Sequence, residues 1–315
     1  MDCAESRKRE RFEGESLVND RTAVLVLGMA RSGTSAVTRV LSLCGATLPS
    51  DLVPPDKHNP NGYWESRRVL NTNERILRHH RIAFHDPAPD EIAASAWAVN
   101  SVRRYLKSIQ PQPLPVIKDP QIITLTKVWE EGATKAGYTP VAVIPIRHPQ
   151  PVIASIRNVD IRPSAELAAA LWLKNTLLAE RNTRGMPRVF VDYHNLLKDW
   201  RREVKRVAHK LQIDLDANSA VDEFLTSRPA NGQMPRLFGT DWINTVYEVL
   251  CAAALDEPVD HETLDEVFEA YRVCEHDMRT ALADARRITA VQRFFPPTVM
   301  DLGRKVAALL HKVRN

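Results

Sequence analysis

The segment AVLVLGMARSGTSAVTRVLSLC, residues 23–44, decides how the rest of this chain is interpreted. Residues 23–28 are aliphatic up to Gly28 and predict a buried strand, whereas residues 34–44 predict a helix. A short loop, residues 29–33, joins the two. A helix that begins directly after such a loop points its unpaired backbone N–H groups, and the positive end of its dipole, at one spot. The segment therefore predicts an anion site, with phosphate as its typical ligand.

Polar side chains in and after the loop strengthen this interpretation. Arg31 brings a permanent bidentate cation, and Ser32, Thr34 and Ser35 bring hydroxyl donors. The two glycines of the loop would, by themselves, indicate only a tight turn. Their spacing matches the Walker A pattern GxxxxGK[ST], but Thr34 stands where that pattern requires lysine. The substitution counts against a nucleotide triphosphatase more strongly than against phosphate binding.

Composition limits the class of protein. A chain of 315 residues, 44% of them hydrophobic, fits one large or two ordinary globular domains. The net charge of +4 is too balanced to indicate a nucleic-acid partner. The charged N-terminus has no signal-peptide core and no segment has the apolar length of a membrane span, so a cytoplasmic location is expected. Four scattered cysteines predict neither a zinc site nor a disulfide framework.

Strand and helix patterns alternate after the first segment. The strands are predicted at residues 114–117, 141–146 and 188–192, and the helices between and after them at residues 66–81, 151–157, 165–181 and 198–211. This alternation predicts an α/β fold, a central parallel sheet with helices on both faces. We expect a mobile charged arm at residues 1–20, a catalytic core at 21–212, and a helical region at 213–315 that completes the fold. The helices of that last region are predicted at residues 241–255, 261–286 and 298–313.

Candidate ligand-binding residues follow the strands, because ligands gather at the carboxyl ends of parallel strands. Lys118 follows the second strand, where it points to the site or merely ends the strand in solvent. Arg147 follows the third strand, and Ser155 lies on the next helix. These two could clamp a second phosphate, or equally be a surface cation and a hydroxyl bonded to its own helix. Tyr193 follows the fourth strand, as an adenine contact or as a core residue.

Glu65 is the candidate general base. It ends a segment rich in proline, asparagine and glycine (residues 48–64), and a long irregular loop beside a phosphate site is often part of the active site. A carboxylate there could accept a proton from a substrate. It could equally stabilise the N-terminus of the following helix through the dipole. Its spacing does not separate the two roles.

Three motifs together resemble the sulfotransferase superfamily that uses 3′-phosphoadenosine 5′-phosphosulfate (PAPS). They are GMARSGTS, IKDP and RHPQPVIAS, each at a strand end and in the family's order, and VDYHNLLKDW follows them. The resemblance covers roughly residues 21–211. It implies a P-loop-like sulfotransferase fold and transfer of a sulfuryl group to an acceptor hydroxyl, with 3′-phosphoadenosine 5′-phosphate (PAP) as product and with no metal.

The resemblance assigns roles residue by residue. It places the 3′-phosphate clamp on Arg147 and Ser155, and Tyr193 is a candidate for the adenine. Lys118 corresponds to a lysine that assists the transferring group, and Glu65 to a glutamate base of the branch that has a KDP-like element. Cytosolic members have a histidine where this chain has Asp119, so the base must come from elsewhere. The 5′-phosphosulfate loop, with Arg31 also proposed as catalytic, falls on Met29, Ala30, Arg31, Ser32, Gly33, Thr34 and Ser35.

Other functions and partners remain open at this stage. A carbohydrate, a glycolipid or a secondary metabolite is the expected acceptor. The alternatives are a P-loop nucleotide kinase or NTPase, which would need the missing lysine, and a non-catalytic PAP-binding protein. The last predicted helix has an apolar stripe flanked by basic residues. Such a helix docks on its own domain or on a second chain in a homo-oligomer, and membrane-surface binding is the less favoured outcome.

Overall fold

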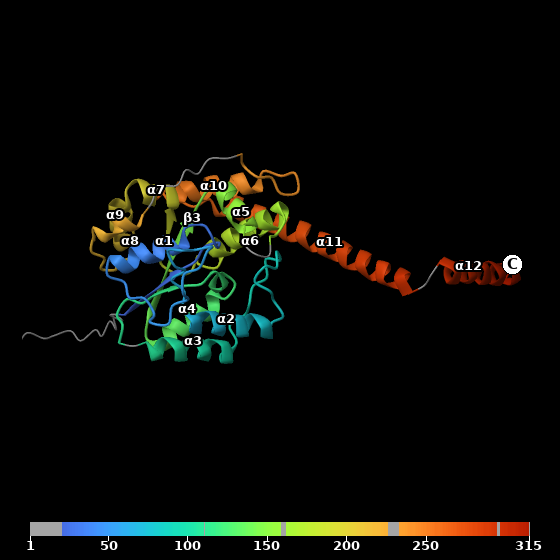
Figure 1. Ribbon diagram of the computed structural model, residues 1–315, viewed down its shortest axis with the longest axis horizontal. Helices are drawn as coiled ribbons and strands as arrows, with labels where there is room; N and C mark the ends of the chain where they lie inside the picture. The colour runs from blue at the N-terminus through green and yellow to red at the C-terminus, as the bar shows by residue number, and fades with distance from the viewer. Residues whose placement is uncertain (1–20, 110, 159–161, 226–232, 295–296, 315) are drawn as a thin grey trace, which may run out of the picture.

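The computed structural model describes residues 21–109, 111–158, 162–225, 233–294 and 297–314 (Figure 1). The predicted arm at residues 1–20 lies outside these ranges. Within them, one parallel sheet has the strand order β2-β1-β3-β4. This confirms the predicted α/β class. The strands are β1 (Thr22–Val26), β2 (Val116–Lys118), β3 (Thr139–Ile146) and β4 (Arg188–Asp192).

Both faces of the sheet are covered by helices, as the sequence predicts. Alternate residues of β1 point to opposite faces, so Val24 and Val26 join one hydrophobic cluster while Ala23 and Leu25 join another. The first cluster packs against α1 (Thr34–Leu43) and α8 (Trp200–Leu211). The second packs against α4 (Thr126–Ala136), α6 (Ala165–Arg181) and α10 (Trp242–Ala253). Burial on both faces explains why the strands read as continuous apolar runs.

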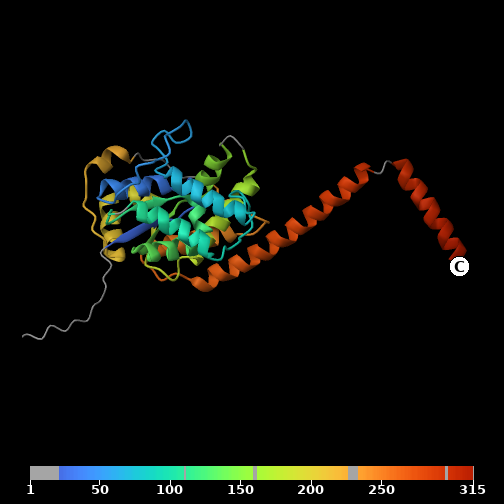
Figure 2. The same ribbon diagram turned by 90° about the horizontal axis from the view of Figure 1, so that it is seen from below.

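The remaining helices connect the strands or follow the sheet. They are α2 (Arg67–His79), α3 (Ala96–Ser108), the short 3₁₀ helix η1 (Pro120–Ile123), α5 (Pro149–Arg157), α7 (Tyr193–Lys198), α9 (Ala220–Phe224), α11 (His261–Phe294) and α12 (Pro297–Arg314). Figures 1 and 2 show α11 leaving the body of the molecule, with α12 beyond its end. No helix in the described ranges combines the length and the apolar character needed to cross a membrane.

N-capping residues explain where two of the predicted helices begin. The helix at 165–181 and the strand at 188–192 have the predicted bounds, and the Ser164 side chain accepts a hydrogen bond from the Leu167 N–H. The helix predicted at 198–211 begins at Trp200 instead, because Asp199 caps it. The strand predicted at 114–117 is shifted to Val116–Lys118. Pro115 has no N–H for the ladder, and only the residues after it pair with β1.

Two buried helices were missing from the sequence prediction. They are α3 and α4, which pack against each other beneath the sheet. The signal was present in α3, where Ala98, Val99, Val102, Tyr105 and Leu106 are buried at helical spacing. The helix predicted at 261–286 also continues to Phe294, since the residues after 286 keep the helical period.

Gly132 sets the approach of α3 to α4 and gives a test of this packing. A Cβ at this position would lie 2.6 Å from Val102 Cγ1 and 2.7 Å from Val102 Cβ. Valine is stiff at χ1, so the helices would have to separate. Overpacking costs about 1–3 kcal/mol, whereas alanine gains about 1 kcal/mol of helix propensity. We expect Gly132→Ala to lower the free energy of unfolding by about 1 kcal/mol in urea denaturation.

The control for this prediction is the same substitution in a Val102→Gly background. Glycine removes both Val102 Cγ1 and Val102 Cβ, so the 2.6 and 2.7 Å contacts are absent and Gly132→Ala should be neutral or stabilising there. A single Gly132→Ala variant more stable than the wild type would contradict the packing described.

Candidate active site

The loop after β1 holds a strained backbone against the start of α1. Arg31 and Gly33 have φ values of 73° and 91°, both in the left-handed region. Gly33 is required there, because a Cβ would lie 2.5 Å from the Tyr193 ring. No side chain caps the first N–H groups of α1. These groups and the positive end of the helix dipole are therefore available to an anion, as the sequence predicts.

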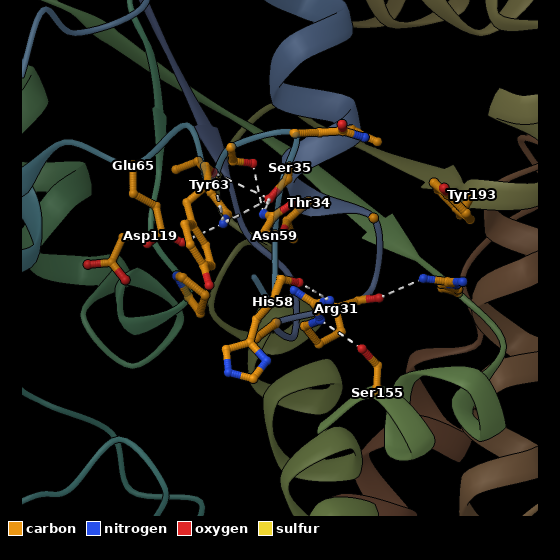
Figure 3. Close-up of a pocket in the computed structure, with 18 of the residues that line it drawn as sticks. Arg31, Thr34, Ser35, His58, Asn59, Tyr63, Glu65, Asp119, Ser155 and Tyr193 are labelled. Carbon is orange, nitrogen blue, oxygen red and sulfur yellow. Dashed lines mark hydrogen bonds and ion pairs between the residues drawn. The ribbon is translucent and has the colours of Figure 1, made fainter. Parts of the chain in front are cut away.

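A cavity of about 640 Å³ opens in front of this loop (Figure 3). That volume is in the range of small-ligand sites. Ala30, Arg31, Gly33, Thr34 and Ser35 line it. It collects side chains from distant parts of the sequence. Its polar and aromatic lining also includes His58, Asn59, Tyr63, Glu65, Phe84, Lys118, Asp119, Gln121, Arg147, Ser155 and Tyr193.

Two residues of the predicted phosphosulfate loop do not line the cavity. The Met29 side chain is buried in the core, where its sulfur accepts a hydrogen bond of 3.2 Å from Asn175 Nδ2. Ser32 is also buried, and its backbone N–H donates to the Met29 carbonyl at 3.0 Å. Both residues hold the shape of the loop. The side chains that face the cavity are those of their neighbours.

Arg31 and Ser155 are joined directly, although 124 residues separate them. Arg31 Nε donates to Ser155 Oγ at 2.8 Å, and a second nitrogen of Arg31 donates to the His58 carbonyl at 2.9 Å. Arg147 donates to the Arg31 carbonyl at 3.0 Å. Arg147 and Ser155, which the sequence predicts as a pair, therefore line one cavity, and Arg31 connects them through hydrogen bonds. Figure 3 shows these bonds on one side of the cavity.

Lys118 and Glu65 form a buried ion pair on the other side of the loop. Lys118 is 4% exposed and Glu65 is 9% exposed. This burial excludes the alternative that Lys118 merely ends its strand in solvent. Lys118 Nζ also lies 3.4 Å from Ser35 Oγ and 3.3 Å from the Tyr63 carbonyl. The two roles left open for Glu65 are both compatible with its place, since it directly precedes Ser66, the N-cap of α2, while its side chain faces the cavity. An ionised carboxylate held beside an ammonium can accept a proton from a bound hydroxyl.

Asp119 is a cavity residue to which the sequence assigned no role. It caps η1 by accepting from the Gln121 N–H at 3.0 Å, and it accepts from Asn73 Nδ2 at 2.8 Å. Asn73 in turn accepts from the Trp129 indole at 2.8 Å. Burial, with a further contribution from the Glu65 charge, raises the pKa of Asp119 to about 6. An aspartate directly before a proline at a strand end was the available sequence signal for this cap.

The loop before Glu65 is ordered by one aspartate. Asp56 Oδ1 accepts from the backbone N–H of His58 and of Asn59, at 2.8 and 3.0 Å, and from the Tyr63 hydroxyl at 2.8 Å. Asn59 Nδ2 donates to Ser35 Oγ at 3.3 Å, which seats the loop on the start of α1. The sequence pointed to this loop but not to these residues, because their contacts depend on the turn that Asp56 makes.

Tyr193 lies at the mouth of the cavity as the first residue of α7. It is half-buried and packs against the core cluster of α1 and α8, and the Arg147 guanidinium lies 4.6 Å from the centre of its ring. Its contact with adenine stays a prediction. Among the described residues, no group of three or more histidine, cysteine, aspartate or glutamate side chains lies together as metal ligands would.

Comparisons with known proteins give weak structural similarities. No protein-family model and no curated protein matches the chain. The sulfotransferase domain of the Synechococcus PCC 7002 olefin synthase matches with a TM-score of 0.42 and 15% identity, over 80% of this chain and 94% of that chain. The sulfotransferase domain of the curacin biosynthetic pathway gives 0.37 and 15%, over 79% and 97%. The sulfotransferase STF1 of Mycobacterium tuberculosis H37Rv gives 0.33 and 13%, over 79% and 76%.

These values describe a distant likeness of chain path. Identities of 13–15% and TM-scores no higher than 0.42 carry no information about donor, acceptor or individual residues. The chemistry of the cavity rests on the side chains that line it.

The buried carboxyl of Asp119 predicts a pH dependence of stability. In the native state the Asp119 carboxyl keeps its proton up to about pH 6, whereas in the unfolded chain it loses that proton near the ordinary pKa of 3.8. Stability should therefore fall as pH rises from about 4 to 6. Asp119→Asn lacks this titration, so the stability advantage of the wild type over the variant should shrink in that window. The expected change is on the order of 2–3 kcal/mol, measured by urea unfolding at each pH. Parallel pH profiles would contradict the assignment.

Proposed function

We propose that this cavity is the active site of a sulfotransferase that moves a sulfuryl group from PAPS to a hydroxyl of an acceptor. The observation that carries the proposal is the Lys118–Glu65 ion pair beside the anion-binding loop, with Arg31, Ser155 and Arg147 on the other side of the same cavity. A loop that binds one phosphate is common to many nucleotide sites. A second cationic cluster and a buried base–cation pair beside it fit a donor with two phosphate positions and a proton-releasing acceptor.

The residues present fit such a donor. The uncapped start of α1 and the hydroxyls of Thr34 and Ser35 would hold its 5′-phosphosulfate end. Arg147 and Ser155 would hold its 3′-phosphate. The bare Gly33 keeps the loop backbone accessible between the two positions, since any side chain there would strike Tyr193. Bound in this way, PAPS would supply the sulfuryl group for transfer.

The chain's own contribution to transfer is charge and position. Sulfuryl transfer resembles phosphoryl transfer, in which positioning and neutralisation of charge provide most of the catalysis. Arg31 and Lys118 would stabilise negative charge on the leaving oxygen, and the burial of Lys118 and partial burial of Arg31 strengthen that effect. Glu65 would take the proton of the acceptor hydroxyl. The ion pair with Lys118 holds this carboxylate at the cavity.

For the acceptor we propose a small hydroxylated molecule: a carbohydrate, a glycolipid or a secondary metabolite. Beyond the loop residues, the cavity lining also includes apolar and polar side chains, among them Leu70, Phe84, Gln121, Phe224 and Leu225. Apolar walls with few polar groups are typical of sites for small organic ligands.

The rival functions predict different ligands. A P-loop kinase or NTPase should bind ATP tightly with magnesium and ignore PAP, but Thr34 stands where its lysine is needed. Thermal unfolding with PAP, and separately with ATP and Mg²⁺, distinguishes the two. Stabilisation by ATP and Mg²⁺ alone would overturn the proposal. Stabilisation by PAP without sulfation of any hydroxyl in a broad acceptor panel would favour the non-catalytic PAP-binding protein.

Arg147→Ala tests the second phosphate position. Loss of one charge-assisted bond costs about 1.5–3 kcal/mol, so we expect PAP to bind roughly 10- to 100-fold more weakly by calorimetry. Adenosine 5′-phosphosulfate, which lacks the 3′-phosphate, should lose far less affinity. Because Arg147 also holds the Arg31 carbonyl, equal losses for both ligands would mean that it acts only on the loop.

Glu65→Gln tests the base. The variant keeps the size of the side chain but cannot accept the proton, and we expect turnover to fall about 100- to 10,000-fold. PAP should still raise the unfolding temperature. The matched control is Glu74→Gln on the exposed side of α2, which should leave turnover unchanged. Turnover near that of the wild type in Glu65→Gln would remove Glu65 from the role.

A further inference from the structure

The helix α11 begins as part of the body and ends outside it. Leu264, Val267 and Tyr271 are buried, and the Tyr271 hydroxyl donates to the Pro87 carbonyl at 2.6 Å. Further along α11, Arg279 forms an ion pair with Asp86 of the body. Beyond it the helix runs away from the body, followed by α12, as Figure 2 shows in orange and red. A long projecting helix with an apolar face is unusual in a chain that acts alone.

One apolar stripe runs along the buried part of α11, its projecting part and α12. Its residues fall on one heptad register, in which seam positions alternate at spacings of three and four; Cys274 and Gln292 occupy two further seam positions, and position 295 lies outside the described residues. The buried start of the series is Leu264, Val267 and Tyr271. The exposed part, which we call the heptad stripe, is Met278, Ala281, Ala285, Ile288, Val299, Leu302, Val306 and Leu309. Its large side chains are 46–63% exposed, including Met278 at 50%, Val299 at 46% and Leu309 at 63%.

The composition of the stripe in α12 indicates a helical partner. Val299 and Val306 occupy one seam position, and Leu302 and Leu309 the other. Aliphatic side chains repeated at these two positions are the kind that pack as knobs into the holes of a facing helix. Leu282 of α11 and Leu310 of α12, which are 50% and 62% exposed, lie directly beside the seam and extend the apolar surface that a partner would cover.

The charges beside the stripe differ in sign between the two helices. Asp277 and Asp284 directly precede stripe residues of α11, and Lys305 precedes Val306 of α12. Residues at this position meet each other across an antiparallel pair of helices. In the monomer, Asp284 pairs with Arg287 and Lys305 with Asp301, both on exposed surface where such pairs contribute little. An antiparallel arrangement of α11 with α12 therefore places the aspartates of α11 beside the lysine of α12.

We propose that two copies of this chain associate through these helices, with the projecting part of α11 of each copy packed antiparallel on α12 of the other. In the register that aligns the stripes, Met278 lies opposite Leu309 of the second copy, and Ile288 opposite its Val299. The same register sets Asp284 opposite Lys305. The end of α12 then reaches Val273, near the place where α11 leaves the body, so the length of α12 covers the projecting part of α11.

A fold-back of α12 onto α11 within one chain does not give this pairing. For one chain to pair its own helices in this register, the chain would have to reverse direction between residues 293 and 294. That point lies inside α11, which is helical to Phe294. Such a turn would unwind the end of that helix. A second copy satisfies the same contacts without unwinding. This inference is independent of the proposed sulfotransferase activity, because it uses no residue of the cavity.

The test is the mass of the full chain in solution. We expect sedimentation equilibrium, over a hundredfold range of concentration, to give about twice the monomer mass of 35.6 kDa. Leu309→Asp places a charge in the seam and should raise the dissociation constant more than about 100-fold. Ala308→Asp, which adds the same charge on the opposite side of α12, is the matched control and should leave the dimer intact.

A charge exchange tests the register. Asp284→Lys and Lys305→Asp should each weaken the dimer about three- to tenfold, because each pair occurs twice, and the double variant should recover most of the loss. A wild-type chain that stays monomeric at every concentration would overturn the proposal. So would a dimer unaffected by Leu309→Asp, or a monomer that binds phosphatidylserine vesicles through α12.

Discussion

The parallel direction of all the described strands is the constraint on which the site depends. Because the strands run the same way and in register, their carboxyl ends lie along one edge of the sheet. Lys118 ends β2, the loop with Arg31 follows β1, and Arg147 follows β3. Three cations from separate parts of the sequence thereby reach one cavity. Helices that cover both faces of the sheet keep this edge as the accessible one.

Cations gathered in this way repel each other and must be compensated. Lys118 is paired with Glu65, and the remaining donors bind hydroxyls and carbonyls: Arg31 binds Ser155 and the His58 carbonyl, and Arg147 binds the Arg31 carbonyl. A buried pair of this kind gains little stability over an apolar pair of the same size, since both charges lose their hydration. Its place at the cavity fits a function in binding and proton transfer better than a function in stability.

The apolar surface of the chain is divided between two uses. The sheet and its helices bury their apolar faces within one body, whereas α11 carries the same helical stripe from buried positions such as Tyr271 into exposed ones such as Met278. An apolar stripe that continues past the body at heptad spacing is typical of one side of a protein–protein interface. The body thus contains the candidate site, and the projecting helices provide the contact that we propose between two copies.

The sequence by itself determined the elements with strong local signals. The strand–loop–helix start, the parallel α/β class, the capped helix after Ser164 and the anion loop with Arg31 could all be predicted, because periodicity and caps act over a few residues. It also placed Glu65, Lys118, Arg147 and Ser155 near the same edge. It missed the buried helices α3 and α4, where tertiary packing selects among weak local patterns.

Only the tertiary structure decided which of these residues touch. Strand order and the path of the loop before Glu65 join residues far apart in the chain, and no local pattern encodes such pairs. Hence Lys118 pairs with Glu65 and Arg31 with Ser155, while Met29 turns into the core. The raised pKa of Asp119 was hidden for the same reason, because burial and the charge of Glu65 cause it. Local sequence chose the groups, and packing chose their partners.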